Sequence, residues 1–403
     1  MTDPNPTDLA RFQTEARDWI RTRFPPSLRG RGAPLASDTL DADQAAWLKA
    51  MGARGWGVPT WPAVYGGAGL SPAHAKIIDA ELANAGAYNP IMSMGVIMLG
   101  PTLLEFGSEA QKLRHLPPVA RGEIRWCQGF SEPGAGSDLA SLQTRADDCG
   151  DHFTINGQKV WTSYADHADW CFCLVRTDTT RKQGGISFVL FDMRQPGVEV
   201  RPIALISGES PFCETFLSDV RAEKDDLVGE LNAGWTIAKR LLQHERSAIS
   251  GGGDEIGAGV FLPDLARERI GLDAEGRLAD ADLRARIIRN EMESRIVDQT
   301  IARAAAEARA TPGASAVSSI LKNAGVRVFQ TRAELILEVM GQQGLGWDGE
   351  DFSDQELASV RDWLHGKAWS IFGGSEEVQN NIIAKRILGL PDPSSTPPSR
   401  EQT

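Results

Sequence analysis

A short glycine- and serine-rich segment is the first part of the chain that could do chemistry. Residues 131–138 run Ser-Glu-Pro-Gly-Ala-Gly-Ser-Asp. Small side chains let several backbone N–H groups converge in a tight turn, and such turns bind anions, phosphates above all. Ser131 and Ser137 would add hydroxyl donors. Most such segments are only turns, but this one opens a β-rich region beside Trp126 and Phe130, which favours an anion site.

A second segment, residues 156–163, offers a flat aromatic surface and a hydroxyl group. Asn156-Gly157 is the strongest short signal for a hairpin turn, so a new strand is expected after it. Trp161 and Ser163 lie two positions apart and would share one face of that strand. A planar cofactor could stack on the indole and bond to the hydroxyl. The alternative is a core tryptophan beside a strand serine.

One carboxylate lies within an apolar stripe of a helix predicted over residues 234–250. Steps of three and four residues place five side chains on one helix face: Trp235, Ala238, Leu242, Glu245 and Ile249. A carboxylate on a buried stripe is costly unless it is paired, and loss of water raises its pKa toward the range of a general base. Glu245 is therefore a candidate base. The alternative is a salt bridge with Arg246 or another arginine.

A glycine pair near the C-terminus separates two predicted helices. Gly373-Gly374 ends the first helix, and Ser375 can cap the second with Glu377 in its first turn. This pattern is typical of a plain corner between helices. A helix N-terminus is also a place where phosphate or ribose binds, so both interpretations stay open.

Other familiar patterns carry no chemistry in this chain. Residues 344–349 spell G-x-G-x-x-G, but they follow a helix, so the dinucleotide-binding context is missing. The six histidines are scattered, and Cys171 and Cys173 lack a second pair of ligands, so no metal site is expected. The five cysteines are instead expected to be buried free thiols in a reducing compartment.

Three regions that differ in their predicted secondary structure must position these segments. Helical spacing dominates residues 1–125, short β-rich runs as in a small antiparallel barrel or sandwich follow in 126–232, and 233–390 are helical again. Residues 391–403 are rich in proline and serine and are expected to form a disordered tail. The predicted fold class is therefore mostly α with a middle β domain.

Charge and hydropathy exclude several classes of protein. The 403 residues include 42 Lys and Arg against 54 Asp and Glu, a net charge of −12. This balance argues against binding to nucleic acid and to anionic lipid. The longest apolar run, residues 90–104, is shorter than the roughly 20 residues of a membrane span and predicts a buried core helix. Residues 1–7 do not resemble a signal or transit peptide, so a cytoplasmic location is expected.

Taken together, five ordered segments resemble the acyl-CoA dehydrogenase family of flavoproteins over roughly residues 19–391. The segments are residues 55–69, 106–112, 131–138, 157–163 and 373–386. The resemblance implies an N-terminal helical domain, a small β-barrel or sandwich, and a C-terminal four-helix bundle through which the chain self-associates as a dimer or tetramer. It also implies non-covalent FAD, bound by a set of residues: Gln128, Phe130, Ser131, Gly136, Ser137, Trp161, Ser163, Arg267, Ser375 and Glu377.

The resemblance further implies a reaction on an acyl-CoA thioester. A base takes the α-proton while the β-hydrogen leaves as hydride to flavin N5, giving a trans-2-enoyl-CoA, and an electron-transfer flavoprotein accepts the electrons. Many members carry the catalytic Glu where this chain has Gly373, which cannot be a base. Glu245 followed by Arg246 instead resembles the isovaleryl- and long-chain-type members. The substrate would contact Ser137, Arg246 and the backbone N–H of Gly373.

Two departures from the family pattern leave alternatives open. An arginine of the family that reaches a neighbouring subunit's FAD is matched only approximately, by Arg267 in residues 267–271, and a flavin-contacting glutamine is replaced by Glu338. One alternative is a partner-dependent subunit of a hetero-oligomeric acyl-CoA dehydrogenase, and another is an acyl-CoA oxidase. The length and branching of the acyl group, steroid side chains included, stay open.

Overall fold

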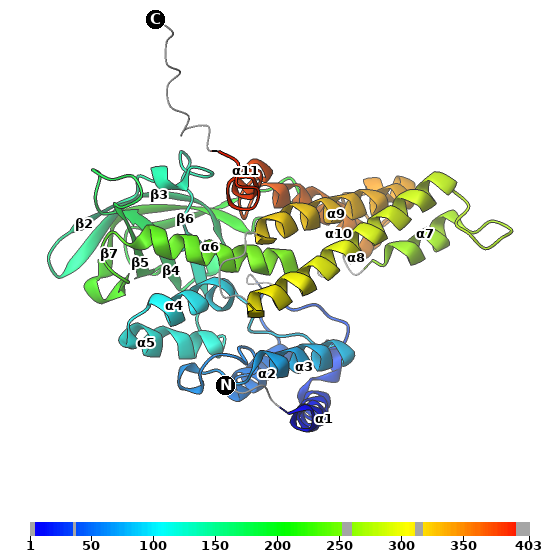
Figure 1. The fold of residues 1–403 in the computed structure, drawn as a ribbon, viewed down its shortest axis with the longest axis horizontal. Coiled ribbons are helices and arrows are strands. Elements are labelled where there is room, and N and C mark those ends of the chain that lie inside the picture. The colour runs from blue at the N-terminus through cyan, green and yellow to red at the C-terminus, as the bar shows by residue number, and fades with distance from the viewer. Residues whose placement is uncertain (1–4, 35–37, 252–259, 311–316, 392–403) are drawn as a thin grey trace, which may run out of the picture. The chain divides into compact units, whose positions relative to one another are not determined.

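The structure is a computed structural model that describes residues 5–34, 38–251, 260–310 and 317–391. For residues 246–251, 305 and 308–310 it describes the backbone alone. The chain divides into two units, which are described separately: unit 1 is residues 1–203 and 210–241, and unit 2 is residues 204–209 and 242–403. Helices, strands and helices follow one another in the predicted order (Figure 1). Residues 392–403 of the predicted disordered tail lie outside the described residues.

Unit 1 begins with five α-helices: α1 Pro6–Arg23, α2 Ala42–Arg54, α3 Pro72–Asn84, α4 Gly100–Phe106 and α5 Glu109–Ala120. Their ends follow local sequence signals. Asp41 and Ser108 each form a capping box at the start of α2 and α5, and Gly55 ends α2 in the left-handed conformation. Buried apolar side chains that include Ile20 and Trp47 join α1, α2 and α3 into one core.

The apolar run 90–104 is helical only from residue 95 onward. A π-helix at Gly95–Leu99 leads directly into α4. Gly100 leaves no room for a side chain, because a Cβ there would lie 2.1 Å from Trp61, and at Gly95 a Cβ would lie 3.1 Å from Trp126, a tight contact. The predicted buried helix is thus confirmed in its second part, where it packs closely on Trp126 at the start of the sheet.

The middle of the chain forms one sheet of eight strands: β1 Trp126–Gly129, β2 Arg145–Asp148, β3 His152–Ser163, β4 Trp170–Arg176, β5 Ile186–Asp192, β6 Val198–Ile203, β7 Phe212–Glu223 and β8 Leu227–Val228. The order is β6-β7-β3-β2-β4-β5-β8, and β1 pairs with β4. Because β4 lies parallel to both β1 and β2, the expectation of a purely antiparallel sheet is wrong. Parallel strands need a crossover connection, and the connection from β1 to β4 contains both candidate cofactor-binding segments.

The predicted hairpin turn at Asn156-Gly157 is wrong, because β3 runs through both residues. The turn between β2 and β3 is formed earlier, around Gly150, which has a φ of +93°. Asn156 instead exchanges two hydrogen bonds with Asp219 on β7, at a point where the register between β3 and β7 shifts. The Asn-Gly pair therefore marks a β-bulge, which uses the same conformational freedom of glycine as a turn does.

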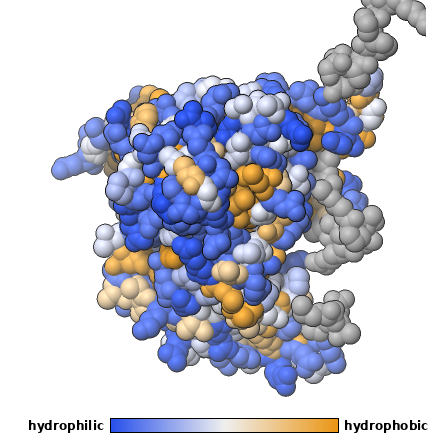
Figure 2. Space-filling model, turned by 90° about the vertical axis from the view of Figure 1, so that its left-hand side faces the viewer, coloured by the Kyte–Doolittle hydropathy of each residue, from blue (hydrophilic) through white to orange (hydrophobic). Residues whose placement is uncertain are grey.

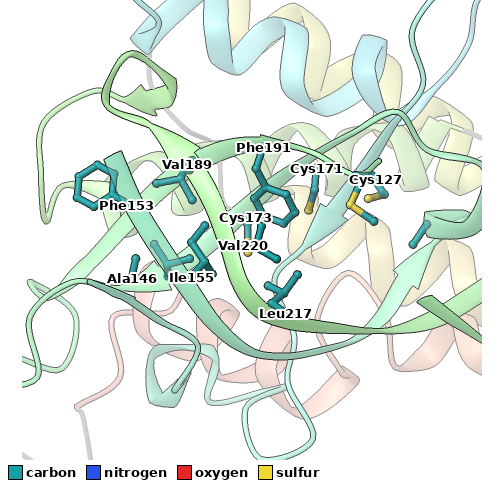
Figure 3. Close-up of a cluster of buried hydrophobic side chains, with 14 of the residues drawn as sticks. Cys127, Ala146, Phe153, Ile155, Cys171, Cys173, Val189, Phe191, Leu217 and Val220 are labelled. Atoms are coloured by element: carbon teal, nitrogen blue, oxygen red, sulfur yellow. The ribbon is translucent and has the colours of Figure 1, made fainter. Parts of the chain in front are cut away.

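Three cysteines lie together in the core of the sheet (Figure 3). Cys127 and Cys171 are register partners on β1 and β4, and Cys173 follows on the same face. Burial raises the pKa of the Cys171 and Cys173 thiols well above the ordinary value, so both stay protonated. The prediction of buried free thiols is confirmed for these three and for Cys213, but it is wrong for Cys149, which is exposed.

Six helices complete the described chain: α6 Gly234–Gly251, α7 Leu262–Ile270, α8 Ala281–Ala310, α9 Val317–Met340, α10 Asp354–Gly366 and α11 Glu376–Arg386. Helix α6 spans the boundary between the two units, and the others lie in unit 2. Helix α9 contacts α7, α8, α10 and α11 and so forms the centre of unit 2 (Figure 1). Polar contacts reinforce the packing, because Asn290 on α8 is buried and donates to the backbone oxygen of Val328 at 2.8 Å.

On the face that Figure 2 shows, hydrophilic residues predominate and apolar ones form separate patches. Within the described parts of the chain, no helix combines the length and hydropathy that crossing a bilayer requires.

The bulge at Gly157 gives a test of the fold. Gly157 has a φ of +156°, and a Cβ there would lie 2.6–2.8 Å from atoms of Thr144. Gly157→Ala should therefore lower the free energy of unfolding by about 2–3 kcal/mol, measured by urea denaturation. Gly32→Ala is the matched control, because a Cβ at Gly32 meets no described atom within 4 Å. Equal stability of the two variants would contradict this register.

Candidate functional site

The segment 131–138 forms an open turn at the end of β1. Glu132 and Ala135 exchange backbone hydrogen bonds of 3.0 and 2.9 Å, which close the turn. Gly136 and Ser137 are exposed, and an added Cβ at Gly134 or Gly136 would meet no described atom within 4 Å. The backbone of this turn is therefore accessible, as the predicted binding of an anion requires.

A buried ion pair fixes this turn to the sheet. Lys159 on β3 has a side chain only 1% exposed, and its Nζ donates to Glu132 Oε1 at 2.8 Å and to the backbone oxygen of Phe130 at 3.2 Å. The Glu132 carboxylate also accepts the backbone N–H groups of Gln143 and Thr144. Burial alone would raise the pKa of Glu132, but Lys159 and these hydrogen bonds outweigh it and hold that pKa below its ordinary value.

Sequence reasoning missed this ion pair. Glu132 and Lys159 were visible inside the two candidate segments, but they are 27 positions apart, and no local pattern pairs them. The chemical signal was the charge itself, because a lysine that a strand buries needs a partner.

The strand that follows Lys159 presents an indole to solvent. Trp161 is 55% exposed and has a φ of +61°, where a bulge shifts the register between β3 and β7. Left-handed backbone is costly for a bulky residue, and such strain is typical of functional sites. Thr162 is buried and Ser163 is half-buried. The alternative of a core tryptophan is therefore wrong, and the indole is available as a stacking surface.

The two candidate segments of unit 1 lie side by side. The backbone N–H of Val160 donates to the backbone oxygen of Ser131 at 2.9 Å, immediately beside the Lys159 contacts. Phe130 is buried against Phe172 and Phe188, with ring centroids 6.0 and 6.1 Å apart, and the half-buried Gln128 pairs with Phe172 in β4. Unit 1 thus brings an accessible backbone turn next to an exposed aromatic surface, which fits a cofactor with both a diphosphate and a flat ring system.

The glycine pair in unit 2 forms a left-handed turn before α11. Gly373 and Gly374 have φ values of +70° and +95°, and the Ser375 hydroxyl accepts the backbone N–H of Val378 as the predicted cap. A hydrogen bond from Ser375 lowers the pKa of Glu377, so this carboxyl is ionised at neutral pH. The predicted corner and cap are confirmed, and the turn lies at a helix N-terminus, where the first backbone N–H groups have no partner within the helix.

Glu245 lies on α6 and is half-buried. The deepest positions of this helix are Ile237, Ala238 and Leu241, so the buried face is displaced by about one residue from the predicted stripe, and Trp235 and Leu242 are half-buried. Glu245 follows Leu241 by four residues and therefore continues the buried face. The side chains of Arg246 and Ile249 lie outside the described residues.

Residues 267–271, which only approximately match the family's arginine element, and Glu338 form their ion pairs within unit 2. Arg267 pairs with Asp264 at 2.7 Å, and Arg269 donates to Glu356 at 2.9 Å. Both oxygens of Glu338 accept hydrogen bonds from Arg286, at 2.7 and 2.6 Å. Glu338 therefore has its counter-ion inside the chain.

Comparison with known proteins identifies the class. Residues 7–123, 127–220 and 232–388 match the N-terminal, middle and C-terminal domains of acyl-CoA dehydrogenases, in that order. The chain belongs to the acyl-CoA dehydrogenase family, as the resemblance predicted, and is an oxidoreductase of this FAD-dependent class.

Individual relatives cover nearly the whole chain. The acyl-CoA dehydrogenase IpdE1 of Mycobacterium tuberculosis is 36% identical over 392 residues, 95% of this chain and 98% of that protein. Two solved structures are similar in fold. The ChsE4-ChsE5 complex of M. tuberculosis has a TM-score of 0.74 at 29% identity over 97% of this chain and all of that chain. The Tcur3481-Tcur3483 steroid ACAD has a TM-score of 0.77 at 27% identity, with the same coverage of both chains.

Two lysines that form ion pairs with the 131–138 turn allow a matched test of the buried pair. Lys159→Met should lower the free energy of unfolding by about 3–5 kcal/mol, because it leaves the Glu132 carboxylate buried without its cation. Lys182 binds the same turn through Asp138 at 2.8 Å, but both side chains are about 60% exposed. Lys182→Met should therefore cost less than about 1 kcal/mol. Urea denaturation measures both, and a Lys159→Met variant as stable as Lys182→Met would contradict the anchoring role.

Proposed function

We propose that the chain dehydrogenates an acyl-CoA thioester to the trans-2-enoyl-CoA, with Glu245 as the base that takes the α-proton. Bound FAD would supply the hydride acceptor, N5 of its ring. The observation that best supports this role of Glu245 is the combination of Gly373, which cannot be a base, with a carboxylate that continues the buried face of α6. Desolvation of a carboxylate makes it a stronger base toward a weakly acidic carbon.

Other residues of the chain would position the reactants. The turn 131–138, with Gln128 and Phe130 behind it, would bind the ring and diphosphate of FAD, and Trp161 and Ser163 would flank the ring. Ser375 and Glu377 would lie toward the ADP part. The backbone N–H of Gly373 would stabilise the thioester oxygen as negative charge develops on it, and Ser137 and Arg246 would contact the substrate.

The acyl group and the electron acceptor also belong to this proposal. One similar structure is named as a steroid ACAD, so acyl-CoAs with steroid side chains stand beside straight and branched chains as substrates to test. An electron-transfer flavoprotein is the proposed acceptor. Oxygen consumption without another acceptor would instead support the oxidase alternative. The cytoplasmic location stays a prediction that agrees with four buried free thiols.

The role of Glu245 has a direct test. Glu245→Gln keeps the size of the side chain but removes the base, so flavin reduction by an acyl-CoA should slow by about 10²–10⁴-fold while FAD stays bound. Anaerobic stopped-flow absorbance measures the rate, and the flavin spectrum reports binding. Glu268→Gln, at an exposed position of α7, is the control, and an acyl-CoA should reduce its flavin at the wild-type rate. Flavin reduction at the wild-type rate in the Glu245→Gln variant would rule out Glu245 as the base.

A second candidate is a partner-dependent subunit of a hetero-oligomer. Two observations favour it: Arg267 and Glu338 are engaged by Asp264 and Arg286 within the chain, and two similar structures are named as pairs of different chains. A chain with an incomplete cross-subunit site would retain little FAD when expressed alone and would gain it with its partner. Near-stoichiometric FAD in the chain purified alone would argue against this candidate.

An apolar stripe on α8 supports the proposed self-association. Ile288, Met292 and Ile296 recur at intervals of four residues and are 53–59% exposed, whereas Leu283 and Ile287 are buried. Such a stripe on an exposed helix face is typical of an interface between subunits. Unit 2 therefore has an apolar surface available for a second copy or a sister chain.

Charge placed on this stripe should disrupt the assembly. Met292→Glu would bury an unpaired carboxylate in the interface, so the oligomer should dissociate at least tenfold more readily. Analytical ultracentrifugation measures the dissociation constant. Gln342→Glu adds the same charge at an exposed polar position and should leave assembly unchanged. Unchanged assembly of Met292→Glu would show that α8 is not the interface.

A further inference from the structure

A buried lysine lies beneath the glycine turn of unit 2. Lys322 on α9 is 1% exposed, and its Nζ donates to the backbone oxygens of Ser370 at 3.1 Å and Gly374 at 2.8 Å. Among the described residues it forms no ion pair with a carboxylate. Its positive charge is therefore held by carbonyl dipoles alone.

A buried ammonium without a carboxylate partner is unfavourable unless an anion lies nearby. Burial lowers the pKa of Lys322, and the more distant Glu376 and Glu377 act in the opposite direction. Apart from Ser319, the other buried residues of this helix, such as Leu321 and Phe329, are apolar. A role beyond packing would account for a lysine at this position.

A second buried side chain holds the same turn. Gln379 is fully buried, and its Nε2 donates to the backbone oxygens of Gly373 at 2.7 Å and Gly374 at 3.3 Å. In a trans peptide the N–H points away from the carbonyl of the same unit. The N–H groups of Gly374 and Ser375 therefore point away from Gln379 and Lys322, and neither has a hydrogen-bond acceptor within the described part of the chain.

We infer that Lys322 is a positioning residue: together with Gln379 it orients the amides of Gly374 and Ser375 toward a bound anionic oxygen, and its charge on the Gly374 oxygen polarises the N–H of Ser375. An ammonium on a carbonyl oxygen draws electron density through the peptide and makes the attached N–H a stronger donor. This inference rests on the proposed function. The anionic oxygen belongs either to the thioester as it becomes an enolate, where these amides would act beside the N–H of Gly373, or to the diphosphate of FAD.

Acetoacetyl-CoA, a short thioester whose α-carbon loses a proton readily, tests whether the anionic oxygen is that of the enolate. Enolate absorbance of the bound probe, titrated against pH, reports how strongly the site favours the ionised form. Lys322→Met removes the charge at nearly constant length, and we expect its preference for the enolate to fall at least tenfold. Gln379→Met is the matched control, because it removes a neutral anchor of the same turn. Its effect should stay within about threefold.

The dissociation constant of FAD, measured by fluorescence on the apoprotein of the same variants, tests whether the anionic oxygen is that of the diphosphate. If Lys322→Met loses FAD affinity tenfold while the ionisation of bound acetoacetyl-CoA is unchanged, the amides bind the diphosphate. The reverse result assigns them to the thioester oxygen. Both results support the inference. Changes of equal size in Lys322→Met and Gln379→Met, or no change in either measurement, would overturn it.

Folding and the proposed function are controlled separately. If Lys322→Met does not give a folded protein by circular dichroism, Lys322→Gln replaces it, because glutamine removes the charge but keeps two donors. Wild-type protein that binds neither acetoacetyl-CoA nor FAD would overturn the proposed function itself. Wild-type protein that binds both, with variants that behave like it, would overturn only the role of Lys322.

Discussion

The buried ion pair between Glu132 and Lys159 is the contact on which the arrangement of the candidate site in unit 1 depends. It ties the open turn after β1 to the strand that carries Trp161, and one ammonium holds both the Glu132 carboxylate and the backbone of Phe130. Without it, the turn and the exposed indole would be joined mainly by one backbone hydrogen bond, from Val160 to Ser131. A buried charge network of this kind fixes geometry more than it adds stability.

The glycine turn of unit 2 uses the same physical solution. Lys322 and Gln379 hold the carbonyl oxygens of this turn, as Lys159 holds the backbone oxygen of Phe130. Glycines permit the left-handed turn, but they do not select one orientation of its peptides. Buried long side chains make that selection. The proposed chemistry needs preorganised donors, because dipoles that must reorient as charge develops stabilise a transition state poorly.

Local patterns were sufficient for the order of the helical and β-rich regions and for one helix cap. Ser375 caps α11 as predicted, and the capping boxes of Asp41 and Ser108 follow local signals of the same kind. The sheet was harder, because the parallel pairing of β4 and the bulge at Gly157 depend on contacts between distant strands. The candidate segments were identified from the sequence. Their anchors, Lys159 and Lys322, were not, since the partners of a buried lysine lie 27 to 52 positions away.

We propose that this chain binds FAD and transfers two electrons to it from an acyl-CoA. The visible spectrum of the purified chain, followed by anaerobic titration with straight, branched and steroid-side-chain acyl-CoAs, tests both steps. We expect a bound flavin whose absorbance is bleached by at least one acyl class. A bound flavin that no acyl-CoA reduces would contradict the proposed reaction, and a colourless chain would contradict the claim that it acts without a partner.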